Sequence, residues 1–278
     1  MRASGRHRQL FTVSAVAILV TLASTGLSAQ WFNYQAAGIP RLPDGKPDLR
    51  APAPKLSDGM PDLFGVWKRI SPPKLVAANR SDGRPFGLEY FVADGEQIPM
   101  TPEAAARFKR RAEVDLWAGR PSERCLPHAT PDAMLHSLFQ IIPHRTLTTI
   151  LFEEFNYYRR IHTDGRQLPD DPNPAWFGYS VGRWQGDTLV VDSRGFSTGF
   201  EEFGWLDDTG HPYSSALHVI ERFRRTDFGH LNLDVTFDDP GAYLRTWNVP
   251  LRFELQPETE MIENVCENEK DHQRVLKK

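Results

Sequence analysis

The chain has few cysteines, no strong excess of one charge and no signature of nucleotide binding. Its 278 residues include two cysteines and carry a formal net charge of −3. That balance argues against non-specific binding to nucleic acid, which requires a basic surface. Neither a Gly-rich phosphate-binding loop nor a dinucleotide fingerprint occurs. The sequence therefore predicts no nucleic-acid partner and no cofactor.

Long apolar runs are also scarce, and the main one stands near the start of the chain. Basic residues at positions 2, 6 and 8 precede the apolar segment from Leu10 to Leu22, and small residues follow up to Ala29. This pattern is typical of a cleaved secretory signal, and the segment is too short to span a bilayer. We predict a signal peptide over 1–29, a periplasmic or secreted location and no integral membrane contact after cleavage. An uncleaved N-terminal anchor is the alternative.

The two cysteines, Cys125 and Cys266, fit export to an oxidising compartment. A bridge between them would close a loop of about 140 residues, which stabilises a fold by roughly 4–5 kcal/mol in the chain-entropy model. We predict this disulfide; two free buried thiols are the alternative.

A proline-rich segment separates the signal from the body of the protein. Within 30–63, PDGKPDL at 43–49 recurs as SDGMPDL at 57–63. Asp-Gly turns followed by X-Pro steps favour a turn and then an extended chain. We therefore predict an extended strap over 30–63 and a single β-rich domain over 64–278. Thr101-Pro102-Glu103 has the residue types of a helix start, which predicts a helical insertion near 101–118.

Alternation of apolar and polar residues dominates from residue 64 onward. It predicts strands near 64–68, 146–154, 156–163, 179–185, 188–193, 217–225, 231–237, 243–255 and 259–266. Short turns join most of them without helical crossovers, which favours an antiparallel up-and-down barrel, with a two-sheet sandwich as the alternative. Gly65-Val66-Trp67 on the first strand resembles the opening of lipocalin-type (calycin) barrels.

Glu221 is the most informative residue of these strands. On the strand 217–225 it shares a face with Leu217, Val219 and Phe223, so it is predicted to point inward. A buried carboxylate must be paired or protonated. It is either a general acid or base, assisted by His162 or His218, or one half of a structural ion pair.

The strand 156–163 could supply a partner for Glu221. Arg159 shares one face with Ile161, whereas Tyr158, Arg160 and His162 share the other. Neither face is clearly apolar, so either set could line a ligand cavity. A guanidinium in such a wall suits an anionic ligand group.

Other candidates are weaker. Arg166, in the turn Asp164-Gly165-Arg166, could contact a ligand at the barrel mouth, although an exposed turn arginine is commoner. Among the aromatics, Trp184 and Trp205 are candidate ligand contacts, and the loop 196–211 is a candidate lid. No histidine pair has the helical i, i+4 spacing with glutamate that a zinc peptidase needs, so no metal is predicted.

The motifs DGMPDLFGVW, RRIHTDGR, GYSVGRWQGDTLVVDS, LHVIERFRR and VCEN form a specific set. Together, over residues 40–268, the chain resembles a large group of uncharacterised secreted bacterial proteins. The resemblance implies an exported, disulfide-bearing, compact domain and implies no reaction. We therefore expect a barrel that binds a partly hydrophobic small molecule and performs acid–base chemistry on it. A non-catalytic carrier or sensor and a structural envelope protein are the alternatives, and the sequence leaves the oligomeric state open.

Overall fold

The computed structural model describes residues 37–78, 85–115, 119–199 and 201–266, which all belong to one compact unit. The predicted signal peptide, 1–29, and the first part of the predicted strap lie outside these residues. Within them, no helix is both long and apolar enough to cross a membrane.

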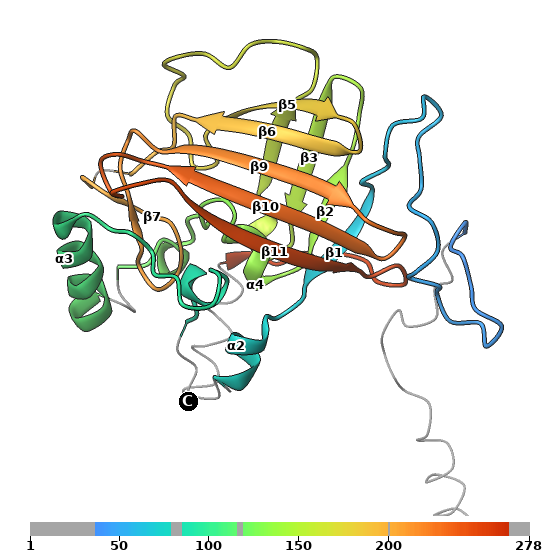
Figure 1. Cartoon of the computed structure of the whole chain (residues 1–278), viewed down its shortest axis with the longest axis horizontal. Coiled ribbons are helices and arrows are strands. Elements are labelled where there is room, and N and C mark those ends of the chain that lie inside the picture. Colours follow the sequence, from blue (N-terminus) through green and yellow to red (C-terminus); the bar gives the residue numbers. More distant parts are fainter. Residues whose placement is uncertain (1–36, 79–84, 116–118, 200, 267–278) are drawn as a thin grey trace, which may run out of the picture. The chain divides into compact units, whose positions relative to one another are not determined.

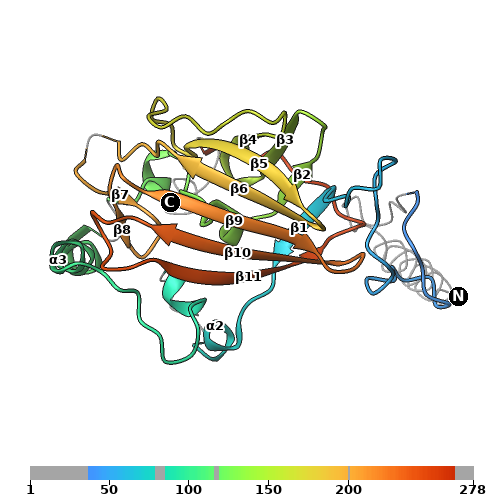
Figure 2. The same cartoon turned by 45° about the horizontal axis from the view of Figure 1, so that its top comes forward.

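Within the described residues nine strands close a barrel (Figures 1 and 2), which confirms the predicted fold class. In order around the barrel, the strands are β1 (Gly65–Arg69), β11 (Trp247–Leu255), β10 (His230–Asp238), β9 (His218–Arg225), β6 (Thr188–Arg194), β5 (Tyr179–Gln185), β4 (Tyr158–His162), β3 (Leu147–Phe152) and β2 (Phe139–Ile142). Strands adjacent in the chain are mostly adjacent in the barrel, as the short turns predicted. The sandwich alternative is not observed.

One pair of neighbours departs from the predicted antiparallel order. β4 and β5 run parallel, with Ile161 opposite Ser180 and His162 opposite Val181. The other eight neighbouring pairs are antiparallel. Directions cannot alternate throughout a closed ring with an odd number of strands, so at least one pair must be parallel. The connection 163–178 accordingly returns the chain to the end at which β4 began.

One predicted strand is absent, another begins later than predicted, and one strand was not predicted. The segment 259–266 contains no strand, and Ile262 within it is 66 % exposed, so its apolar residues do not form a buried face. The last strand begins at Trp247, because residues 243–246 belong to the preceding turn. Strand β2 was not predicted, since four residues are too few for a recognisable alternation.

The long connection from β1 to β2 contains most of the helical turns. It holds α2 (Pro73–Ala77), η1 (Leu88–Tyr90), α3 (Pro102–Arg110), the π-helical turn η2 (Arg111–Asp115), η3 (Ser122–Arg124) and α4 (Ala133–His136). Thr101 caps α3 as predicted: its hydroxyl accepts a hydrogen bond from the Ala104 backbone N–H at 3.2 Å. Outside this connection, η4 covers Glu154–Asn156, and β7 (Gly204–Trp205) pairs with β8 (Pro212–Tyr213) in a separate hairpin.

The sequence repeat in the strap is also a structural repeat. In each copy a turn closes around Asp-Gly, with the same backbone hydrogen bonds in both: Leu42 N–H to Lys46 and Asp48 N–H to Pro40, then Leu56 N–H to Met60 and Asp62 N–H to Pro54. The segment between the turns docks on the β9–β10 connection, where Gly229 N–H donates to Leu49 at 2.7 Å. The strap is therefore a pair of turns fixed to the body.

One part of the barrel interior is packed with aromatic side chains. Trp67 is fully buried, its indole N–H donates to the Leu63 carbonyl at 3.2 Å, and the Arg225 guanidinium lies over its ring at 5.0 Å. Phe139 and Phe253 meet edge to face with ring centroids 4.9 Å apart. This packing places the glycine–tryptophan motif of β1 in the core.

The predicted disulfide is present. Cys125 and Cys266 are bonded across a separation of 141 residues, and they tie the segment after β11 to the β1–β2 connection. This bond also fixes the chain next to Pro127, at the edge of the site described below.

Candidate functional site

Glu221 points into the barrel, as predicted, and pairs there with Arg159. Their exposed fractions are 0 % and 1 %. Arg159 Nη1 donates to Glu221 Oε1 at 2.9 Å, and Nη2 donates to Oε2. Side chains alternate between the two faces of a strand, and Ile161 is buried on the same face of β4 as Arg159. Arg159 therefore points inward, where it reaches Glu221. The structure therefore settles the orientation of the strand that the sequence left open.

Three hydroxyl groups complete the hydrogen bonds of this buried pair. Thr130 donates to Glu221 Oε1 at 3.2 Å and accepts from Arg159 Nη1 at 2.9 Å. Ser180 accepts from Arg159 Nε at 3.2 Å, and Ser193 accepts from Nη2 at 2.9 Å. The two ends of the guanidinium are thus saturated by protein groups. The inward position of Glu221 is confirmed, whereas its catalytic role stays a prediction.

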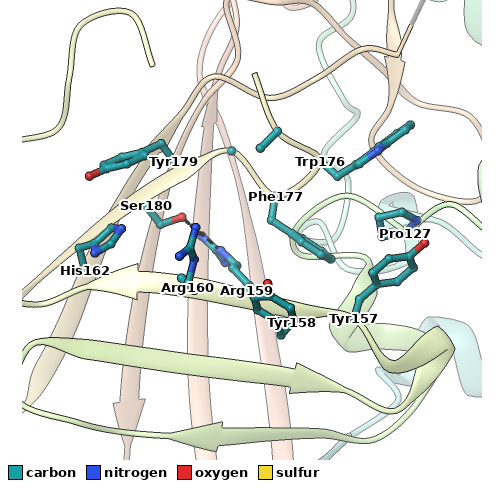
Figure 3. Close-up of a pocket in the computed structure, with 12 residues that line it drawn as sticks. Pro127, Tyr157, Tyr158, Arg159, Arg160, His162, Trp176, Phe177, Tyr179 and Ser180 are labelled. Carbon is teal, nitrogen blue, oxygen red and sulfur yellow. Dashed lines mark hydrogen bonds between the residues drawn. The ribbon is translucent and has the colours of Figure 1, made fainter. Parts of the chain in front are cut away.

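A pocket of about 310 Å³ opens on the other side of the β4–β5 wall (Figure 3). The parallel pair β4–β5 has only two residues in register, so the two strands separate beyond Ile161 and Ser180. The pocket occupies this gap. Its lining residues are Pro127, Tyr157, Tyr158, Arg159, Arg160, His162, Ala175, Trp176, Phe177, Gly178, Tyr179 and Ser180.

Arg160 carries the free charge of this pocket. It is exposed on the outer face of β4, and among the described residues its side chain makes no hydrogen bond or ion pair. Arg159, by contrast, is neutralised by Glu221. Tyr158 is 60 % exposed, and its hydroxyl also has no hydrogen-bond partner within the described chain. Together with Trp176 and Phe177 these side chains form an aromatic pocket with one available guanidinium.

His162 and Tyr179 form one wall of the pocket. Their rings stack with centroids 5.1 Å apart, and Arg166 Nη1 donates to the Tyr179 hydroxyl at 2.8 Å. Burial and the positive charge of Arg166 lower the pKa of His162. Arg166 is held in its turn by Asp164, whose carboxylate accepts from Nε at 2.9 Å. RRIHTDGR therefore contributes to the pocket through Arg159, Arg160 and His162, while Arg166 braces the wall.

Three predicted site residues lie elsewhere. His218 pairs with Asp192 at 2.7 Å on the outer side of β9, and β5 and β6 separate it from His162 on β4. Trp184 packs against the core from β5. Trp205 is buried in the β7–β8 hairpin under the Arg111 guanidinium, 4.4 Å from its ring, and lines a second hollow of about 340 Å³. The structure does not bring these residues together with Glu221 or Arg160.

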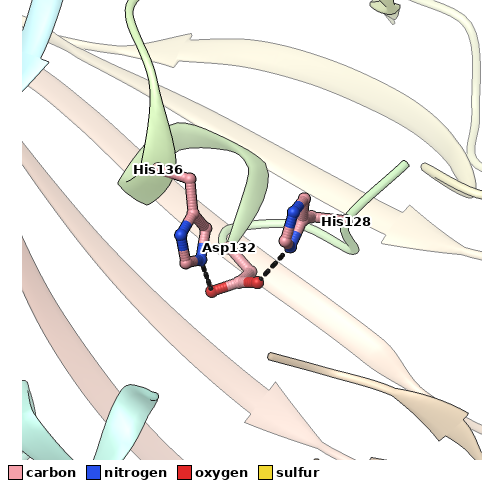
Figure 4. Close-up of side chains that lie close together, drawn as sticks. All are labelled: His128, Asp132 and His136. Carbon is pink, nitrogen blue, oxygen red and sulfur yellow. Dashed lines mark hydrogen bonds and ion pairs between the residues drawn. The ribbon is translucent and has the colours of Figure 1, made fainter. Parts of the chain in front are cut away.

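A cluster that the sequence analysis missed surrounds Asp132 (Figure 4). His128 Nδ1 lies 2.7 Å from Asp132 Oδ2, and His136 Nε2 lies 3.1 Å from Oδ1 of the same carboxylate. The two imidazole rings stack with centroids 4.5 Å apart. These three residues, on α4 and the segment before it, form a group whose donor atoms could hold a metal ion.

Further acids face the same histidine. Asp208 Oδ1 lies 3.3 Å from His128 Nδ1, and Glu154 Oε2 lies 3.1 Å from His128 Nε2. Burial opposes protonation of His128, but the negative charge of Asp208 and the hydrogen bonds that the ring donates to Asp132 and Glu154 outweigh it and raise its pKa well above the usual value. The other oxygen of Asp208 pairs with Arg120 at 3.0 Å.

A second buried cluster lies in the β7–β8 connection. Asp207 Oδ2 accepts from the Leu88 backbone N–H at 2.8 Å and lies 2.6 Å from His211 Nδ1. Its Oδ1 accepts from the backbone N–H groups of Thr209, Gly210 and His211. Glu89 lies 3.8 Å from the same imidazole. Because Asp207 is saturated by backbone donors, it acts chiefly as the brace of this hairpin.

Spacing is the signal that could have found the first cluster. In HATPDAMLH a histidine, an aspartate and a histidine stand four residues apart. That spacing places side chains on one side of a helix. Here Pro131 interrupts the segment and the helix covers only Ala133–His136, so the sequence shows no recognisable helical pattern. Asp208 and Glu154 approach through tertiary contacts and have no local signal.

Comparison of the chain with protein-family profiles, with curated proteins and with solved structures gives no match.

Proposed function

We propose that this protein is an exported β-barrel protein that binds a small planar anion in the β4–β5 pocket. The observation that carries the proposal is the unpaired Arg160 guanidinium beside an aromatic lining. Guanidinium groups recognise carboxylates and similar planar anions, and aromatic rings supply the apolar contact. The disulfide and the sequence signal of residues 1–29 support export.

The residues that line the pocket favour a flat ligand with one negatively charged end. Apolar surface predominates in the lining, so most of a bound molecule would contact rings and aliphatic groups. Figure 3 shows Arg160 between His162 and Tyr179 on one side and Tyr158 and Phe177 on the other. Because Arg159 is already neutralised by Glu221, binding depends on Arg160 rather than on the buried pair.

A non-catalytic carrier or sensor is the function that this geometry supports best. Glu221, the carboxylate proposed for acid–base chemistry, has its oxygens bonded to Arg159 and Thr130 and is 0 % exposed. An enzyme remains the second candidate because His162 stands in the pocket wall with a lowered pKa, as a neutral base requires.

The test compares two fluorescent probes that share one aromatic skeleton. 1-Anilinonaphthalene-8-sulfonate is an aromatic anion, and N-phenyl-1-naphthylamine is the same skeleton without the sulfonate. Removing one charge-assisted contact costs about 1.5 kcal/mol, so Arg160→Ala should weaken binding of the sulfonate roughly tenfold. Binding of the neutral probe should change less than twofold.

Arg224→Ala is the matched control. Arg224 is exposed on the outer face of β9 and has no hydrogen-bond or ion-pair partner among the described residues. The Arg224→Ala substitution should leave the affinity of the protein for both probes unchanged. Equal weakening by the two variants, or equal loss of both probes in Arg160→Ala, would contradict the proposed recognition of an anion by Arg160.

A further inference from the structure

The contacts of His128 require positive charge at its Nδ1 atom, supplied either by a bound proton or by a metal ion. Both ring nitrogens face carboxylate oxygens: Nε2 faces Glu154 at 3.1 Å, and Nδ1 faces Asp132 at 2.7 Å and Asp208 at 3.3 Å. A neutral imidazole has one N–H group. If Glu154 accepts that hydrogen, the Nδ1 lone pair points at two carboxylates, and only a proton or a metal ion makes that arrangement favourable.

We propose that His128, Asp132 and His136 form a binding site for a divalent transition-metal ion, with Zn²⁺ as the preferred occupant. Two imidazole nitrogens and a carboxylate oxygen are a donor set that suits zinc and its neighbours. Their donor atoms lie within 4.8 Å of one another. Asp208 Oδ1 is positioned as a fourth donor.

The distances are close to those of a coordinated ion. Zinc bonds of about 2.1 Å place neighbouring tetrahedral donors roughly 3.4 Å apart. Here His128 Nδ1 lies 2.7 Å from Asp132 Oδ2, and His136 Nε2 lies 3.1 Å from the other carboxylate oxygen, Oδ1. With one donor atom taken from each residue, the three atoms lie within 4.8 Å of one another. An ion bound by all three residues would replace these two hydrogen bonds, with the side chains turning so that both imidazole nitrogens and one carboxylate oxygen face it.

The surroundings match those of a metal site in two further respects. Glu154 holds the outer nitrogen of His128, which is how carboxylates orient metal-binding histidines. His136 is partly exposed, with a side-chain exposure of 16 %, and it lines a surface hollow of about 390 Å³ together with Arg69, Ser137 and Glu153. Of the three proposed ligands, His136 is the one that lines this hollow and meets the surface.

Direct binding of the metal alone tests the proposal. The full mature chain, stripped with a chelator, is dialysed against Zn²⁺, and bound zinc is measured by elemental mass spectrometry. One ion per chain is expected, with affinity at least tenfold lower in His136→Gln. The partly exposed His136 is chosen so that the variant folds, which circular dichroism verifies. Asp132→Asn, verified in the same way, should lose binding further.

His218→Gln is the matched control. His218 and Asp192 form a pair with the same 2.7 Å separation, but within the described part of the chain no third histidine or acid is grouped with them as a possible metal donor. This variant should bind zinc as the unaltered chain does. Absence of zinc from the unaltered chain would overturn the site, as would undiminished binding by folded His136→Gln. Because none of the proposed metal ligands lines the β4–β5 pocket, either result leaves the probe experiment on that pocket to be judged on its own.

Discussion

Replacing Glu221 by glutamine should destabilise the protein strongly. The substitution preserves size but leaves the Arg159 guanidinium buried without its counter-charge. Removing one partner of a buried ion pair typically costs about 3–5 kcal/mol. The upper half of that range is expected here, because Arg159 is 1 % exposed and cannot turn to water.

The loss is large relative to the stability of a domain. The free energy of unfolding of native domains is about 5–15 kcal/mol, so the variant would retain only part of that free energy. For a chain of this size, 3–5 kcal/mol corresponds to a fall in Tm of roughly 6–20 °C. Urea unfolding followed by tryptophan fluorescence measures the change, with an unaltered dependence on urea if unfolding stays two-state.

A double variant tests whether the loss of stability comes from leaving one buried charge without its partner. Arg159→Met with Glu221→Leu removes both charges together, and apolar replacements of buried pairs are often neutral or stabilising. The double variant should therefore be more stable than Glu221→Gln, even though Ser180 and Ser193 lose a donor. If Glu221→Gln unfolds at the same urea concentration as the unaltered chain, the pair contributes no stability and the reasoning is refuted.

Two other predictions concern the disulfide and the pocket histidine. Changing Cys125 and Cys266 to serine should lower the free energy of unfolding by about 4–5 kcal/mol, since a loop of 141 residues is released; equal urea midpoints for the two chains would contradict this. The pKa of His162 is lowered by burial and Arg166, so the ring is neutral near pH 7.5 and gains a proton only below its usual value of 6.5. A bound anion favours the protonated ring, so affinity for 1-anilinonaphthalene-8-sulfonate should rise as the pH falls from 7 to 5. Fluorescence titrations should show this rise in the unaltered chain and a weaker one in His162→Gln; identical pH profiles would exclude His162 as its source.

The parts of the fold that follow strand periodicity were predictable. Alternation placed Glu221 inside the barrel, and it allowed Arg159 to reach Glu221 if Ile161 pointed inward, as it does. The pairing of the two cysteines also followed from their number. These inferences succeed because period two assigns each side chain to a face wherever one face is buried.

Other features depend on closure of the ring and on tertiary contacts. The parallel β4–β5 pair arises from the odd number of strands, and the pocket arises from its short register. Its lining residues could not be inferred while the orientation of the strand 156–163 was unknown. The approach of Asp208 and Glu154 to His128 joins segments that are 80 and 26 residues away in the chain, and no local pattern encodes it.

Native mass spectrometry of the mature protein, purified from the periplasm of an expressing bacterium, tests the central claim most directly. The β4–β5 pocket predicts that the unaltered chain retains a small aromatic anion, and that Arg160→Ala loses it while Arg224→Ala keeps it. A chain that carries no small molecule, or a ligand that Arg160→Ala retains fully, would contradict the proposed function.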